Sequence, residues 1–126
     1  MTFLYAPETY KKLTQTEAAA ITNGCGTGGW KIDLVPDTLL GLDITEACNI
    51  HDYMYHIGET IEDKNEADRV FMNNMLRLID AETKHGWLRR FRRRRAIIYY
   101  FAVKNFGGPA FWAGKQDETL YEVKQI

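Results

Sequence analysis

Two helix-start signals on either side of a glycine constrain the fold of this chain more than any other feature. Residues 43–46 (DITE) and residues 63–66 (DKNE) each begin with an aspartate that can accept from the amide three residues on, and each end with a glutamate that can reach back. The first signal predicts a helix over about residues 44–57 that stops at Gly58. Because the connection over residues 58–62 is short, the two helices should be antiparallel neighbours.

Apolar periodicity supports the second helix and predicts a third. The second helix should end near Ala81, and its apolar positions share one broad face: Ala67, Val70, Phe71, Met75, Leu78 and Ile79. A third helix should span about residues 87–105 and stop at residues 106–109 (FGGP). Its apolar stripe is expected to consist of Trp87, Phe91, Ile98 and Phe101.

The remaining segments are less regular. Residues 7–20 favour a helix, because Pro7 suits a first helical turn and the alanines favour helix. Residues 22–42 are rich in glycine and are interrupted by Pro36, which is typical of a long functional loop. No strong strand pattern occurs, apart from a possible short hairpin near the C-terminus. The sequence therefore predicts a mainly α fold.

Length and composition fit a single domain over residues 1–126. The chain is 45% hydrophobic and 13% aromatic, which is enough apolar material for a packed core. The sequence has no run of about 18 apolar residues, so no transmembrane helix is predicted. The first residues lack a basic segment followed by an apolar one, so no signal peptide is expected.

Chemistry-bearing residues gather on the first predicted core helix and its neighbour. His51, Asp52 and Tyr55 lie within about one helical turn. Imidazole is the natural general base near neutral pH, and a carboxylate beside it suits a hard cation such as Ca²⁺. The loop GCGTGG (residues 24–29) can turn several carbonyls inward, because glycine adopts the necessary dihedrals. Asp68 on the partner helix is placed to fix the histidine tautomer.

Each of these pieces alone is more often ordinary surface, but their combination resembles the phospholipase A2 family over roughly residues 23–72. That family has a glycine-rich calcium loop, X-C-G-x-G-G, and a helix carrying C-x-x-H-D-x-x-Y. Its partner helix carries an aspartate before an arginine, as in ADR here. The resemblance implies a phospholipase A2-like fold with two antiparallel core helices carrying the site, an N-terminal helix, a calcium loop and a third helix.

The resemblance also implies a cofactor and a disulfide. Calcium would be bound by the carboxylate of Asp52 and by the backbone carbonyls of Gly24, Gly26 and Gly28. Cys25 and Cys48 fall on the family's disulfide between the calcium loop and the catalytic helix. The secreted animal enzymes have many disulfides, whereas this chain can form at most one. It therefore looks like a minimal microbial or viral relative.

The implied reaction is calcium-dependent hydrolysis of the sn-2 ester of glycerophospholipids. His51 would be the base that activates water, Asp68 its orienting partner, and Tyr55 a hydrogen-bonding support for Asp68. Two other interpretations remain open. One is a phospholipase-like module that binds lipid or protein without catalysis. The other is a metal phosphohydrolase built on a His-Asp pair. Such an enzyme needs further histidines from other helices, and besides His51 this chain has only His56 and His85.

The charge is divided unevenly along the chain. Up to Glu82 there are 6 basic and 14 acidic residues, and after it 10 basic and 3 acidic. Residues 87–95 (WLRRFRRRR) hold six of the eight arginines. This run could be a solvated helix face, a contact for nucleic acid, or a membrane-docking face. The phospholipase interpretation favours docking on an anionic phospholipid membrane through Trp87, Arg89, Arg90, Arg93 and Arg94, with no obligate nucleic acid.

The sequence leaves the oligomeric state unspecified. The implied activity favours a protein that is secreted or delivered to a target membrane, and a cytoplasmic or virion-associated location stays open.

Overall fold

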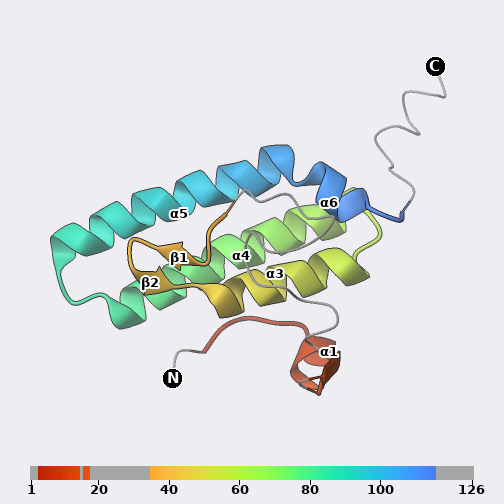
Figure 1. Cartoon of the computed structure of the whole chain (residues 1–126), viewed down its shortest axis with the longest axis horizontal. Coiled ribbons are helices and arrows are strands. Elements are labelled where there is room, and N and C mark those ends of the chain that lie inside the picture. The colour runs from red at the N-terminus through yellow and green to blue at the C-terminus, as the bar shows by residue number, and fades with distance from the viewer. Residues whose placement is uncertain (1–2, 15, 18–34, 116–126) are drawn as a thin grey trace.

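The computed structural model describes residues 3–14, 16–17 and 35–115, and within them the fold is mainly α. Three long helices lie roughly along one axis (Figure 1): α3 (Thr45–Ile57), α4 (Ile61–Glu82) and α5 (Gly86–Phe106). Their bounds agree with the predicted helices to within about one residue, except that α4 begins about three residues before the predicted start. The short elements are α1 (Glu8–Lys11), β1 (Thr38–Leu39), β2 (Leu42–Asp43) and α6 (Gly108–Trp112). The C-terminal hairpin considered from the sequence lies outside the described residues.

Helix α4 is the centre of the fold, because α3 packs on one side of it and α5 on another. The main core joins these helices with the β1–β2 hairpin and includes Ile44, Phe71, Met75 and Ile79, each less than 2% exposed. A second cluster, with Tyr55 and Phe111 at its centre, holds α6 against the C-terminal end of α3. The predicted antiparallel α3–α4 pair is therefore present, with buried side chains along its interface.

The caps of these helices differ from the predicted ones. Helix α4 begins at a capping box formed by Thr60 and Asp63, in which the Thr60 hydroxyl accepts from the Asp63 amide at 3.1 Å. The Asp63 carboxylate accepts in return from the Thr60 amide at 3.1 Å. At α3, Asp43 accepts from the Thr45 amide at 2.9 Å, and Glu46 accepts from the Tyr10 hydroxyl rather than reaching back. Both predicted capping boxes are therefore wrong, although the helices that they predicted exist.

The N-terminal helix is shorter than predicted. Helix α1 ends at Lys11, and a new helix-start signal follows it. The Thr14 hydroxyl accepts from the Glu17 amide at 3.1 Å, and the Glu17 carboxylate accepts from the Thr14 amide at 3.0 Å. A reciprocal pair of this kind is typical of a helix N-terminus, where the capping residue is not helical, so one continuous helix over residues 7–20 is wrong.

The β1–β2 hairpin was missed from the sequence. Its turn consists of Leu40 and Gly41, with φ of 48° and 83°, and two successive positive φ values are typical of a type I′ hairpin turn. Glycine adopts this conformation readily, whereas leucine rarely does. The Arg92 guanidinium donates to the Leu40 carbonyl at 2.9 Å and so ties the turn to α5.

Helix α5 buries a different face from the one predicted. Its buried side chains are Ala96, Tyr99 and Val103. The predicted apolar stripe is exposed instead, with Trp87, Phe91, Ile98 and Phe101 between 49% and 64% accessible. Because residues are about 100° apart around a helix, this stripe lies opposite the buried face. Helix α5 therefore has two apolar faces, only one of which packs against the rest of the described chain.

Candidate active site

The centre of the candidate site is a buried hydrogen-bonded cluster between α3 and α4. Helix α3 contributes His51 and Tyr55, which are 7% and 5% exposed, and α4 contributes Asp68, which is 1% exposed. His51 Nε2 lies 2.8 Å from Asp68 Oδ1, and the Tyr55 hydroxyl donates to the same oxygen at 2.7 Å. The antiparallel helix pair thus brings together three residues that the sequence predicts to act together.

Aromatic packing fixes the orientation of the imidazole. The His51 ring lies 4.1 Å from the Tyr55 ring and 4.7 Å from the Phe71 ring, measured between centroids. When Nε2–H of a neutral imidazole donates to a carboxylate, the lone pair of the ring is on Nδ1. We assign this tautomer from the hydrogen bond to Asp68. Nδ1 is then the nitrogen that can accept a proton.

Lys64 is a fourth member of the cluster that sequence reasoning missed. Its ammonium donates to Asp68 Oδ2 at 2.8 Å and is 4% exposed. The available signal was the spacing of Lys64 and Asp68, since residues four apart on a helix face each other. Such pairs are usually on the surface, and the sequence did not indicate that this one is buried.

The hydrogen bonds stabilise the charged form of Asp68. Burial by itself would raise the pKa of this carboxyl, but the hydrogen bonds from His51, Lys64 and Tyr55 and the charge of the imidazolium form outweigh it, so the pKa lies below its usual value. Burial is also the largest cause that raises the pKa of the Tyr55 hydroxyl, followed by the negative charge of Asp68. Tyr55 is therefore a hydrogen-bond donor to a carboxylate.

The predicted calcium site lies partly outside the described residues. Asp52 is half-buried on α3, and its charge contributes to the raised pKa values of Tyr55 and Tyr10. The predicted carbonyl ligands from Gly24, Gly26 and Gly28 lie outside the described residues. Among residues 3–14, 16–17 and 35–115, no three His, Cys, Asp or Glu side chains form a metal-binding group. A carboxylate combined with backbone carbonyls is nevertheless an all-oxygen donor set, which suits Ca²⁺.

Only one cysteine of the predicted disulfide lies within the described residues. Cys48 is 3% exposed on the first half of α3, within the main core. Its proposed partner Cys25 lies outside the described residues, so the Cys25–Cys48 bond stays a prediction.

The N-terminal segment packs against the site helices through polar contacts. The Tyr53 hydroxyl donates to the Thr9 hydroxyl at 2.7 Å, and the Tyr53 and Tyr10 rings meet edge to face at 5.3 Å. The Asn74 side chain exchanges hydrogen bonds with the backbone of Tyr5 at 2.8 and 2.9 Å. The Tyr53 contacts place α1 beside α3, which is the helix that carries Asp52.

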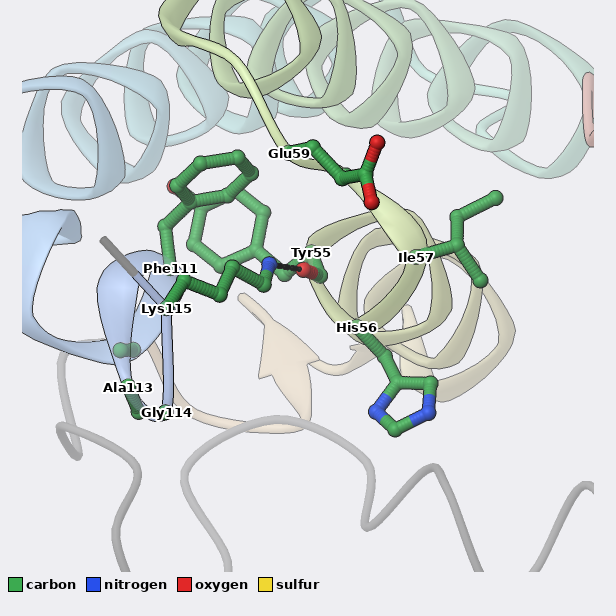
Figure 2. A pocket seen from close by; sticks show the side chains of 10 residues that line it. Tyr55, His56, Ile57, Glu59, Phe111, Ala113, Gly114 and Lys115 are labelled. Atoms are coloured by element: carbon green, nitrogen blue, oxygen red, sulfur yellow. Dashed lines mark hydrogen bonds between the residues drawn. The ribbon is translucent and has the colours of Figure 1, made fainter. Parts of the chain in front are cut away.

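A hollow of about 540 Å³ lies at the C-terminal end of α3 (Figure 2). The Lys115 ammonium donates to the Tyr55 carbonyl at its wall, and Phe111 and His56 also line it. Burial lowers the pKa of Lys115, against the charges of Asp63 and Glu59. The hollow therefore adjoins the backbone of Tyr55, whereas the hydroxyl of Tyr55 contacts Asp68.

The predicted docking arginines divide into two groups. Arg93 pairs with Asp80 at 2.8 Å, and Arg89 donates to the Thr83 carbonyl at 2.8 Å and lies 3.9 Å from Asp80. These two hold α5 to α4. Arg90 and Arg94 are exposed and have no ion-pair or hydrogen-bond partner among the residues that the structure describes.

The chain matches no protein family, no curated protein and no solved structure.

Proposed function

We propose that the protein hydrolyses the sn-2 ester of glycerophospholipids in a calcium-dependent reaction, releasing a fatty acid and a lysophospholipid. The observation that carries this proposal is the buried cluster of His51, Asp68 and Tyr55, with Asp52 next to His51 on the same helix. A histidine base held by a buried carboxylate is suited to activating water. The sequence resemblance to the phospholipase A2 family supplies the substrate class.

Each residue of the cluster has a distinct role in the proposed reaction. His51 takes a proton from water at Nδ1, and the water oxygen forms the new bond to the ester carbonyl carbon. Asp68 holds the ring through Nε2 and stabilises the imidazolium that forms. The bond between the carbonyl carbon and the glycerol oxygen then breaks, and His51 returns the proton to the leaving alkoxide. Because water is the nucleophile, no acyl-enzyme is formed. A positioned base of this kind contributes on the order of 10²–10⁴ in rate.

Calcium would be held by Asp52 together with the carbonyls of Gly24, Gly26 and Gly28. When bound, Ca²⁺ supplies a positive charge that polarises the ester carbonyl and stabilises the oxyanion.

We further propose that the outer face of α5 docks on anionic membranes. Its exposed stripe of Trp87, Phe91, Ile98 and Phe101 is flanked by exposed Arg90, Arg94 and Arg95. No acidic residue occurs between Thr83 and Lys115, so nothing within this segment offsets its positive charge. An amphipathic helix with aromatic and basic residues suits the interface of an anionic bilayer.

The proposed docking residues differ from those predicted from the sequence. Arg89 and Arg93 are replaced by Arg95, because the first two are engaged with Asp80 or Thr83. Trp87, Arg90 and Arg94 are retained. No helix in the described part of the chain combines the length and apolar composition needed to cross a bilayer, so α5 would lie on the surface of the membrane.

The proposed activity is tested by measuring the turnover of phospholipid by wild type and by His51→Ala. We expect the substitution to lower turnover by at least about a hundredfold, because it removes the general base. The matched control is His56→Ala, which removes an exposed histidine from the same helix and should retain wild-type turnover. Equal turnover of His51→Ala and wild type would exclude the proposal.

A further inference from the structure

Lys64 is a buried cation whose donors are all used. Its ammonium donates to Asp68 Oδ2 at 2.8 Å, to the Val103 carbonyl at 3.2 Å and to the Lys104 carbonyl at 3.2 Å. An ammonium has three N–H donors, so these acceptors account for all of them. A lysine is almost never buried unless it is paired, and Lys64 is 4% exposed.

The surroundings of Lys64 match its charge. The two carbonyls belong to the last turn of α5, which ends at Phe106. The Val103 carbonyl also accepts from the Gly107 amide at 2.8 Å. Carbonyls in the last turn of a helix carry partial negative charge, so a cation is favourable there. Asp68 provides the full negative charge. Lys64 therefore joins three parts of the structure: its own helix α4, the end of α5 and the carboxylate beside His51.

Lys64 also determines how the oxygens of Asp68 are shared. Oδ1 accepts from His51 and Tyr55, whereas Oδ2 accepts from Lys64. Without Lys64, Oδ2 would lose its partner and the buried carboxylate would lose its counter-charge. The side chain could then turn toward another donor and draw Oδ1 away from the imidazole.

We propose that Lys64 is a positioning residue for the His51–Asp68 pair. By anchoring Oδ2 to the end of α5, it fixes the carboxylate plane and directs Oδ1 at His51 Nε2. Lys64 does not touch substrate in this proposal and acts only through Asp68. The effect on turnover rests on the proposed function, whereas the effect on the imidazole does not.

A double-mutant cycle of Lys64→Met and Asp68→Asn tests this proposal. Methionine has a similar length and lacks the charge. We expect Lys64→Met alone to lower kcat by about 10- to 100-fold with KM nearly unchanged, since small misplacements of catalytic groups have effects of this size. In the Asp68→Asn background, Lys64→Met should change kcat by less than about twofold. Equal losses in both backgrounds would mean that Lys64 supports the fold only, and would overturn the proposal.

The control is Arg69→Met, which removes an exposed cation from the same helix, next to Asp68. Arg69 pairs with Glu66 on the surface, with 61% of its side chain exposed. We expect wild-type kcat from this variant. A loss as large as that of Lys64→Met would show that any cation removed from α4 has the same effect, which contradicts the proposal.

The imidazole proton provides a readout that needs no activity. In wild type, we expect the His51 Hε2 resonance to be visible by proton NMR and slow to exchange, because it is hydrogen-bonded to Asp68. In Lys64→Met it should exchange at least tenfold faster, and Arg69→Met should match wild type. Unchanged protection in Lys64→Met would overturn the positioning role. If the protein proves inactive on phospholipids, this result still decides whether Lys64 orients the pair.

Folding is checked by the melting temperature of each variant. Lys64→Met leaves Asp68 buried without its counter-charge, so its Tm should fall, and adding Asp68→Asn should recover part of that loss. If Lys64→Met does not fold, the double variant supplies the comparison. The double variant should then still fold and melt cooperatively, and its failure to fold would contradict a pairwise role.

Discussion

His51 Nε2 and Asp68 Oδ1 lie 2.8 Å apart across the interface of α3 and α4, with both side chains buried. Neither residue can meet the other unless the two helices are antiparallel and in the observed register. The short connection after Gly58 and the packing of Phe71 against the imidazole both support this register. The fold and the candidate site therefore depend on the same helix pair.

Calcium binding should separate the roles of two adjacent residues. We expect Asp52→Asn to weaken calcium binding strongly, because it removes the proposed charged ligand. His51→Ala should bind calcium about as well as wild type while losing hydrolysis. Isothermal titration with Ca²⁺ measures both variants. Equal calcium affinity of Asp52→Asn and wild type would remove Asp52 from the ligand set.

Removal of arginines from the outer face of α5 should weaken membrane binding. Arg94→Gln with Arg95→Gln removes two exposed cations, each worth about 1 kcal/mol near an anionic surface, so binding should fall by roughly thirtyfold at low salt. The measurement is co-sedimentation with vesicles of phosphatidylglycerol and phosphatidylcholine. The effect should shrink as salt rises, because exposed charges are screened.

The matched control for docking is Lys11→Gln with Lys12→Gln, which removes the same charge from exposed positions at the N-terminal helix. This variant should bind vesicles nearly as well as wild type. A loss equal to that of the Arg94 and Arg95 variant would indicate that net charge, rather than the α5 face, controls binding. Hydrolysis of a short-chain phospholipid in solution should be similar in both variants.

Gly107 allows α5 to end beside the site. A Cβ at this position would be 2.6 Å from the Tyr55 hydroxyl and would also collide with the Val103 carbonyl. We expect Gly107→Ala to lower the free energy of unfolding by about 1–3 kcal/mol, as overpacking does. The control is the adjacent Gly108→Ala, whose Cβ would meet nothing closer than 4.0 Å. Urea unfolding measures the stability of both variants. Equal free energies of unfolding would show that the contacts around a Cβ at residue 107 relax without cost.

Stability at acid pH should reflect the depressed pKa of Asp68. Its folded pKa lies below the ordinary value of 3.8, so the charged carboxyl stabilises the fold at higher pH. This contribution is lost as the pH falls below about 3.8 and through the folded pKa. The difference in unfolding free energy between wild type and Asp68→Asn should therefore shrink between pH 5 and pH 2. Parallel curves over that range would contradict the depressed pKa.

The sequence predicted the long helices well because their signals are local. Gly58 and the apolar spacing of α4 predicted the end of α3 and the end of α4 to within about one residue. The caps were assigned wrongly because Thr60 and Asp63 form a competing capping box three residues earlier, and the sequence alone did not rank the two. The hairpin was missed because Leu40 adopts a positive φ that leucine rarely adopts.

Errors at α5 and Lys64 have a different origin. Periodicity identifies the apolar positions of a helix, but it does not tell which face packs against the core when two faces are apolar. Ala96, Tyr99 and Val103 are buried, whereas the larger Trp87 is exposed. The burial of Lys64 depends on the end of α5 lying over α4, which is a tertiary contact without a local signal.

The most direct measurement of the central claim uses a phosphatidylglycerol with different acyl chains at sn-1 and sn-2. The protein is incubated with vesicles of this lipid in Ca²⁺ or in excess EGTA, and the released fatty acids are identified by mass spectrometry. We predict release of the sn-2 acid in Ca²⁺, a loss of at least about a hundredfold in EGTA, and the same loss in His51→Ala. Release of the sn-1 acid, equal release in EGTA, or no release by folded wild-type protein would contradict the proposed function.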